Sequence, residues 1–141
     1  YSDSLSSTEH YYVDFTSPEV VSNVTVSPKL IDYDKEVESY RFISPNESEV
    51  ELRFNVDSVP SIAQLSLTHM VGVANKNKPT SIAIYVNGVP LVNYLSPSQK
   101  AFQTDTLHFS NLIKQGKNTV SVMLGNATSF YLLKQLSIRF K

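Results

Sequence analysis

The chain has 141 residues, a formal net charge of −1 and an apolar content of 41%. This length and apolar content suit one globular domain with a real hydrophobic core. The near-neutral charge, without any run of Lys or Arg, argues against a nucleic-acid-binding protein, which would carry a concentrated basic face. The apolar stretches are too short to span a bilayer, and the absence of cysteine excludes disulfides and thiolate sites.

The N-terminal part of the chain is rich in serine, and the chain begins with Tyr1 rather than Met. A processed secreted protein and a cut piece of a longer protein would both begin in this way. We expect a secreted or cell-surface location. Residues 1–15 are predicted to be a flexible lead-in, followed by a single domain over residues 16–141.

Much of the chain alternates apolar and polar residues with the period of two that is typical of half-buried strands. In chain order, strands are predicted over residues 20–26, 40–42, 50–56, 65–73, 82–86, 107–109, 120–124 and 136–140. Residues 50–56 show the clearest alternation, so one face of that strand is expected in the core. One short helical turn is predicted at residues 111–115, where Ser110 supplies an N-cap and Gly116 a stop.

A β-hairpin is predicted at Asn87-Gly88, directly after the alternating residues Ile82, Ile84 and Val86. Both turn residues tolerate positive φ, so the chain can reverse through a type I′ turn. With about eight or nine short strands joined by turns, the chain is expected to be all-β. The predicted fold class is an antiparallel β-sandwich of the jelly-roll type.

Three segments in the second half of the chain give the order hairpin, strand, short turn and strand: residues 84–88 (IYVNG), 107–113 (LHFSNLI) and 116–120 (GKNTV). In this order they resemble the galactose-binding-domain-like β-sandwich superfamily. That superfamily includes carbohydrate-binding modules and the sugar-binding domains attached to β-galactosidases and polysaccharide lyases. The resemblance covers roughly the C-terminal 60 residues, and it is more specific for the fold than for a ligand.

The resemblance implies carbohydrate recognition through loops at one end of the sandwich. It also implies that Asn126, in the last loop before the terminal strand, forms hydrogen bonds with a sugar. The chain lacks tryptophan, which is the best stacking platform for a pyranose ring, so tyrosine would have to replace it.

Several side chains suit a sugar ring, which offers one apolar face and a rim of hydroxyls. Tyr85 and Tyr94 lie before and after the hairpin residue Asn87. An exposed tyrosine ring can pack against the apolar face of a sugar, and a neighbouring amide can bond its hydroxyls. Phe130 and Tyr131 lie in the last loop, where binding residues often occur. The alternative is that these aromatic residues pack across strands within a sheet.

Carboxylates occupy every second position from Asp32 through Asp34 and Glu36 to Glu38. In an extended segment they would project from one side and offer oxygen ligands to calcium. We therefore consider Asp32, Asp34 and Glu36 as candidate ligands of a structural calcium, an ion that many jelly-roll modules of the resembling superfamily bind, and no other cofactor is predicted. The alternative is a solvated strand edge whose charges block aggregation.

The three histidines show no metal-ligand spacing. His69 lies on the apolar side of its predicted strand, where a buried histidine hydrogen-bonded to a neighbour is the default interpretation. A bulge that turns this side chain outward is the alternative.

No sequence motif of a nucleophilic, zinc-dependent or phosphate-binding enzyme is present, although a glycosidase carboxylate pair needs only proximity in space. We therefore expect a non-catalytic module whose partner is a carbohydrate or cell-surface glycan, with no nucleic-acid ligand and no membrane span. The alternative is a protein-interaction module of an adhesin, a toxin or a surface complex.

Overall fold

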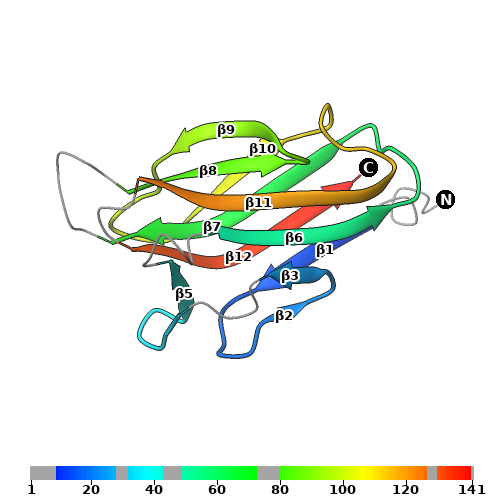
Figure 1. The fold of residues 1–141 in the computed structure, drawn as a ribbon. Coiled ribbons are helices and arrows are strands. Elements are labelled where there is room, and N and C mark those ends of the chain that lie inside the picture. Colours follow the sequence, from blue (N-terminus) through cyan, green and yellow to red (C-terminus); the bar gives the residue numbers. More distant parts are fainter. Residues whose placement is uncertain (1–8, 28–31, 43–48, 73–79, 127–129, 141) are drawn as a thin grey trace.

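The computed structural model of the chain describes residues 9–27, 32–42, 49–72, 80–126 and 130–140. In these ranges the chain forms twelve strands (Figure 1). They are β1 (Glu9–Asp14), β2 (Val21–Ser22), β3 (Thr25–Ser27), β4 (Tyr33–Asp34), β5 (Ser39–Phe42), β6 (Glu49–Val56), β7 (Ala63–Val71), β8 (Ser81–Val86), β9 (Val89–Leu95), β10 (Gln103–His108), β11 (Gly116–Asn126) and β12 (Tyr131–Phe140). Within the described ranges no helix is long and apolar enough to cross a membrane.

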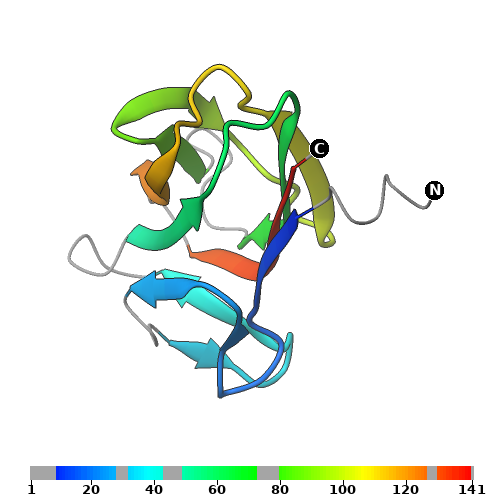
Figure 2. The same cartoon turned by 90° about the vertical axis from the view of Figure 1, so that its right-hand side faces the viewer.

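The strands form two antiparallel sheets that face each other (Figures 1 and 2). Sheet A has the order β10-β7-β12-β1-β2, and β5 pairs with the first residues of β12 and with β4. Sheet B has the order β3-β6-β11-β8-β9. From β5 to β8, and again from β9 to β12, the chain passes from one sheet to the other at each connection. The predicted antiparallel jelly-roll sandwich is therefore confirmed.

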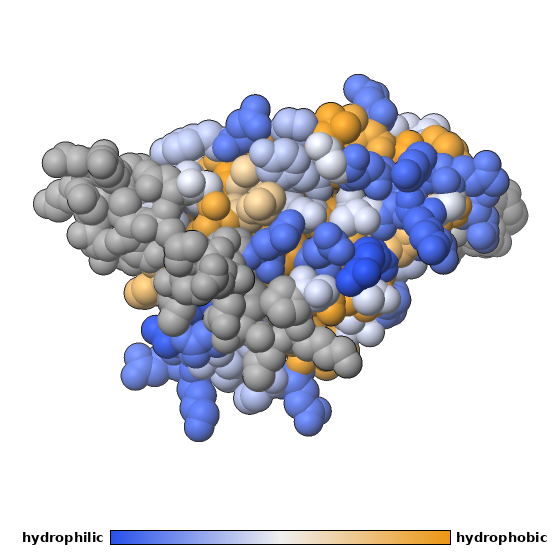
Figure 3. Space-filling model, in the orientation of Figure 1, coloured by the Kyte–Doolittle hydropathy of each residue, from blue (hydrophilic) through white to orange (hydrophobic). Residues whose placement is uncertain are grey.

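The core lies between the sheets and is made by the apolar half of each alternating strand. The side chains of Ile84, Val122 and Ile138 are 0% exposed. Along β6 and β7 buried residues alternate with more exposed ones, as the period-two pattern predicted. The polar half of β6 faces outward, and Figure 3 shows hydrophilic side chains over much of the sheet B face formed by β6 and β11.

The hairpin between β8 and β9 turns through Asn87 and Gly88, whose φ angles are 52° and 82°. Positive φ at both central residues is the mark of the type I′ turn, which confirms the prediction. The Asn87 amide makes three further bonds: Oδ1 accepts from Thr119 N–H at 2.9 Å, and Nδ2 donates to the Leu112 carbonyl and to Asn118 Oδ1, both at 2.9 Å.

The helical turn predicted at residues 111–115 is wrong. These residues form an irregular turn in which Leu112 N–H donates to the Phe109 carbonyl at 2.9 Å. The buried side chain of Asn118 bonds both the N–H and the carbonyl of Lys114, at 3.0 and 2.7 Å, and also the Gly116 carbonyl at 3.1 Å. Because these backbone groups bond the Asn118 side chain, they do not form the hydrogen bonds of a helix.

The N-terminal part differs from its prediction in two ways. Strand β1 lies inside the predicted lead-in, because Val13 and Phe15 are buried in the core and β1 pairs with β12. The single strand predicted over residues 20–26 is wrong, since β2 joins sheet A and β3 joins sheet B. The break comes at Asn23, whose side chain bonds the backbone of β1 at His10 and Tyr12.

The alternation predicts that neighbouring residues of β12 contribute unequally to the free energy of unfolding. Truncation of fully buried Ile138 to Ala leaves a cavity in the core, so we expect a loss of about 2–5 kcal/mol in the free energy of unfolding. Ser137→Ala, on the opposite face of the same strand, should change it by less than about 1 kcal/mol. Urea denaturation measures both. Equal losses in the two variants would contradict the assigned faces.

Candidate functional site

The outer face of sheet A carries an ordered set of polar side chains. Strands β10, β7, β12 and β1 are neighbours, and their register aligns the outward residues in rows across the sheet. The three rows are Thr104–Thr68–Gln135–Asp14, Thr106–Ser66–Ser137–Tyr12 and His108–Gln64–Arg139–His10. Neighbouring strands lie about 4.8 Å apart and successive outward residues about 7 Å apart. We call this set of twelve residues the polar platform.

A shallow depression of about 370 Å³ lies on the platform, within the range of small-ligand sites. Its polar lining comes from all four strands and consists of His10, Tyr12, Asp14, Ser66, Thr68, Thr104, Gln135, Ser137 and Arg139. The rings of His10 and Tyr12 lie 5.6 Å apart along β1. Partial burial, followed by the charge of Arg139, lowers the pKa of His10, so this imidazole is neutral at pH 7.

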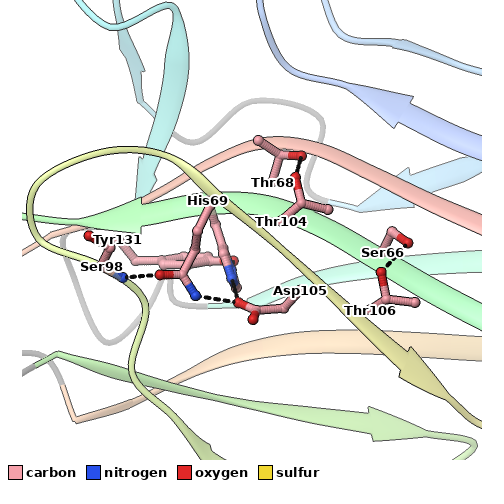
Figure 4. Close-up of polar contacts among 9 residues, drawn as sticks. Ser66, Thr68, His69, Ser98, Thr104, Asp105, Thr106 and Tyr131 are labelled. Atoms are coloured by element: carbon pink, nitrogen blue, oxygen red, sulfur yellow. Dashed lines mark hydrogen bonds and ion pairs between the residues drawn. The ribbon is translucent and has the colours of Figure 1, made fainter.

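The hydroxyls of the platform pair between β7 and β10, as Figure 4 shows. Thr68 Oγ1 lies 2.9 Å from Thr104 Oγ1, and Ser66 Oγ lies 3.1 Å from Thr106 Oγ1. Each hydroxyl has one hydrogen and two lone pairs, and one hydrogen serves each pair. Every pair therefore keeps one hydrogen and several lone pairs for a ligand above the sheet.

A second polar group lies on the inner side of the same strands. His69 on β7 is 0% exposed and contacts residues on both neighbouring strands (Figure 4). His69 Nε2 lies 2.6 Å from Asp105 Oδ2 on β10, and Nδ1 lies 2.7 Å from the Tyr131 hydroxyl on β12. Gln103 Nε2 also donates to Asp105 Oδ2, at 2.7 Å, while Gln103 Oε1 accepts from Ser98 N–H at 2.7 Å.

The protonation of this inner group follows from its surroundings. Burial lowers the pKa of His69 below its ordinary 6.5, although the hydrogen bond and charge of Asp105 act in the opposite direction. Partial burial alone would raise the pKa of Asp105, but the hydrogen bonds from His69 and Gln103 outweigh it and lower that pKa. Asp105 is therefore ionised at neutral pH, and a neutral His69 donates from Nε2 and accepts at Nδ1 from the Tyr131 hydroxyl.

The residues near the hairpin that were predicted to bind a ligand lie elsewhere. Tyr85 is half-buried on the outer face of sheet B, and Tyr94, on the edge strand β9, is 59% exposed. Asn87 has a structural function, because both heavy atoms of its side-chain amide bond other parts of the chain.

The residues of the last predicted loop are also apart from the depression. The backbone of Asn126 ends β11, and its side chain lies outside the described residues. The guanidinium of Arg41 lies 5.7 Å from the ring centre of half-buried Phe130. Tyr131 is completely buried, and burial together with the charge of Asp105 raises its pKa well above the ordinary value. Tyr131 therefore supports the core and offers no surface to a ligand.

The carboxylates predicted as calcium ligands do not fit a metal site. The segment is not extended: β4 ends at Asp34 and residues 35–38 form a turn. Arg41 already compensates Asp32, at 2.9 Å, and lies 4.0 Å from Asp34, while Asp34 Oδ1 accepts from Glu36 N–H at 3.0 Å. Among the described residues no group of three or more acidic, histidine or cysteine side chains could hold a metal ion.

Sequence reasoning missed the platform itself and assigned no ligand-binding function to any of its residues. The signal was present as the polar half of each alternation, for example Thr104-Asp105-Thr106 and Ser66-Leu67-Thr68. This signal marks an outer face but does not say which strands lie side by side. The default prediction for His69, a buried histidine bonded to neighbours, is confirmed.

Neither a family model nor a curated relative matches the chain, whereas solved structures do match the fold. Dimeric latent PorU from Porphyromonas gingivalis aligns with a TM-score of 0.59 and 9% identity over 94% of this chain and 12% of PorU. The CBM36-1 domain of a multidomain xylanase from the hindgut metagenome of Trinervitermes trinervoides aligns with a TM-score of 0.56 and 10% identity over 92% of this chain and 96% of that domain. A family 35 carbohydrate binding module from an environmental isolate gives 0.50 and 11%, with 90% of both chains covered.

The chain thus spans a small part of PorU but nearly the full length of the two carbohydrate-binding modules. At these identities the likeness shows the fold alone, which is a β-sandwich like those of the two CBM domains. The resemblance found in the sequence is therefore confirmed for the fold.

The buried His69 predicts a loss of stability in acid. The unfolded chain takes up a proton at this residue as the pH falls below about 6.5, and the folded chain does so only at lower pH. The free energy of unfolding must therefore fall as the pH falls through this window. Asp105 acts in the same direction, but only below its unfolded-state pKa of about 3.8.

Urea denaturation at pH 7 and pH 5 tests this prediction. The loss on acidification should be smaller in His69→Gln than in the wild type, and His10 contributes equally to both proteins. Ser137→Ala, which changes an outward residue of β12 and removes no titratable group, is the control and should lose as much as the wild type. An equal loss in His69→Gln and the wild type would contradict the prediction.

Proposed function

We propose that this domain is a non-catalytic carbohydrate-binding module that binds a glycan on the polar platform of sheet A. The observation that carries the proposal is the depression in which small hydroxyl side chains from three strands lie beside the ring of Tyr12. A sugar presents hydroxyls at its rim and an apolar face of C–H groups. The depression offers partners for both.

Each part of the platform has a separate task in this proposal. The Tyr12 ring packs against the apolar face of one sugar. Ser137 and Thr104 exchange hydrogen bonds with sugar hydroxyls, and the Arg139 guanidinium donates further hydrogen bonds at the border. The open shape leaves much of a glycan in water, so a single site should bind weakly.

The fold gives independent support. Two of the structures with this fold are described as a carbohydrate binding module and a CBM36 domain, and this chain spans nearly the whole of each. The proposal differs from the sequence prediction in its location, because it uses the face of a sheet instead of loops at one end. We also propose a secreted or cell-surface location, where glycans are displayed, and cell fractionation tests it.

A protein-interaction module would need a contiguous exposed apolar patch. In the described part of the chain the large exposed apolar side chains are Val21, Val59, Ile62, Val89 and Tyr94. They come from β2, from the connection between β6 and β7, and from β9. On the one face that Figure 3 draws, hydrophilic side chains interrupt the apolar areas. These observations favour the glycan over a protein partner.

The proposal predicts that Tyr12→Ala weakens glycan binding by about fivefold or more, because tyrosine is enriched among the contact residues whose truncation costs over about 1 kcal/mol. Affinity electrophoresis against soluble β-linked glycans, galactosides and pectic polysaccharides identifies a ligand, and calorimetry measures its affinity. Tyr94→Ala, on the edge of the other sheet, is the matched control and should bind as the wild type does.

The two tyrosines also separate the platform from the site predicted by sequence. Binding that survives Tyr12→Ala but is lost in Tyr94→Ala or Tyr85→Ala would place the ligand on sheet B and overturn the platform. If the wild-type protein binds none of these glycans, the carbohydrate-binding function itself is rejected.

A further inference from the structure

Strand β10 is the exposed edge of sheet A and depends on one neighbour. It pairs with β7 over residues 103–108, and no other described strand pairs with it. Its inward side chains are Gln103, Asp105 and half-buried Leu107, so the apolar core holds this strand less firmly than the central ones. Yet β10 supplies Thr104 and Thr106 to the platform, with Thr104 lining the depression.

The inner polar group spans the three strands β10, β7 and β12. Asp105 Oδ2 receives hydrogen bonds from His69 Nε2 and Gln103 Nε2, and His69 Nδ1 accepts from the Tyr131 hydroxyl. Burial within the core removes the competition of water for the bond at His69 and strengthens it. A hydrogen bond to a charged group is also stronger than one between neutral groups.

The inner group and the platform lie on opposite faces of the same segment of β10. Asp105 points inward, while Thr104 and Thr106 on either side of it point outward to their partners on β7 (Figure 4). In a strand the inward side chain and its two neighbours share one backbone path. A hydrogen bond that holds Asp105 in place therefore also holds the hydroxyls of Thr104 and Thr106 in position.

We propose that Asp105, held by His69 and Gln103, is a positioning residue for the β10 part of the platform. Resting on the proposed function, this inference adds that glycan affinity depends on a carboxylate on the inner side of the sheet, away from the ligand. The required property is a hydrogen-bond acceptor at the position of Oδ2, not the volume of the side chain.

Two substitutions separate these properties. Asp105→Leu keeps an apolar volume but removes the acceptor, and Asp105→Asn keeps an acceptor oxygen without the charge. Glu51→Leu is the matched control, because the side chain of Glu51 is 33% exposed and that of Asp105 is 28% exposed. Glu51 pairs with Arg53 and lies on the outer face of sheet B, away from β10. Hydrogen exchange of the β10 amides, relative to those of sheet B, measures how firmly the strand is held.

In Asp105→Leu the β10 amides should exchange about 10- to 100-fold faster, because the buried His69 N–H loses its acceptor. Asp105→Asn should restore most of the protection, and Glu51→Leu should leave β10 unchanged. Equally fast exchange in the Leu and Asn variants would show that an acceptor oxygen does not hold the strand, and wild-type exchange in Asp105→Leu would show that Asp105 does not hold it at all. Either result overturns the proposal.

A second variant covers the case in which Asp105→Leu does not fold. Faster β10 exchange in Asp105→Ala that is reversed in Asp105→Asn then supports the proposal, and equal exchange in these two variants overturns it.

The glycan measurement uses the tightest-binding polysaccharide of the panel described above. Affinity should fall about tenfold in Asp105→Leu and recover in Asp105→Asn. Faster β10 exchange with unchanged affinity would overturn the link between the inner group and the platform. A wild-type protein that binds no glycan rejects the proposed function, while the exchange measurement still decides whether Asp105 holds β10.

Discussion

The register of four neighbouring strands, β10, β7, β12 and β1, is the constraint on which both faces of sheet A depend. Side chains alternate between the faces, so a slip of one residue would turn the platform hydroxyls into the core and the core residues into water. The apolar side chains of Leu67 and Ile138 oppose such a slip, because each is fully buried. A bulge between Leu133 and Gln135 adjusts β12 so that Gln135 still meets Thr68 on the outer face. The platform therefore results from the same alternation that builds the core.

Hydrogen-bonding side chains complete the structure where the backbone leaves the sheets. The amides of Asn87 and Asn118 join the β8–β9 hairpin to the segment before β11, and together they satisfy backbone groups of four residues. An asparagine beside a turn suits a sugar ligand and suits a turn equally well, because both need an amide that donates and accepts. The Asn87 amide bonds backbone groups of Leu112 and Thr119, so it serves the turn. The segments that resemble the galactose-binding-domain-like sandwiches thus carry a requirement of the fold.

The fold was predictable from the sequence, and the site was not, for one physical reason. Alternation is a local property, so residues 50–56 or 136–140 reveal their strand and its two faces without reference to the rest of the chain. The platform depends instead on strand order, which brings Tyr12, Ser66 and Ser137 into one row although they are far apart in the sequence. Local patterns also misled where they assumed a backbone shape. The carboxylates from Asp32 to Glu36 share a side only in an extended segment, and here the chain turns after Asp34.

The inner group of sheet A places an ionised carboxylate and two buried polar side chains where apolar residues would also fit. Desolvation makes such groups a weak source of stability, and removal of one partner is costly because the others remain buried. Their benefit is specificity, since His69 can meet Asp105 on one side and Tyr131 on the other in a single register. An apolar set would tolerate more than one packing of the edge strand β10. A binding surface made of short hydroxyl side chains requires this fixed geometry, because a Thr or Ser side chain cannot extend to follow a ligand. We infer that the polar group serves the arrangement of the platform more than the stability of the fold.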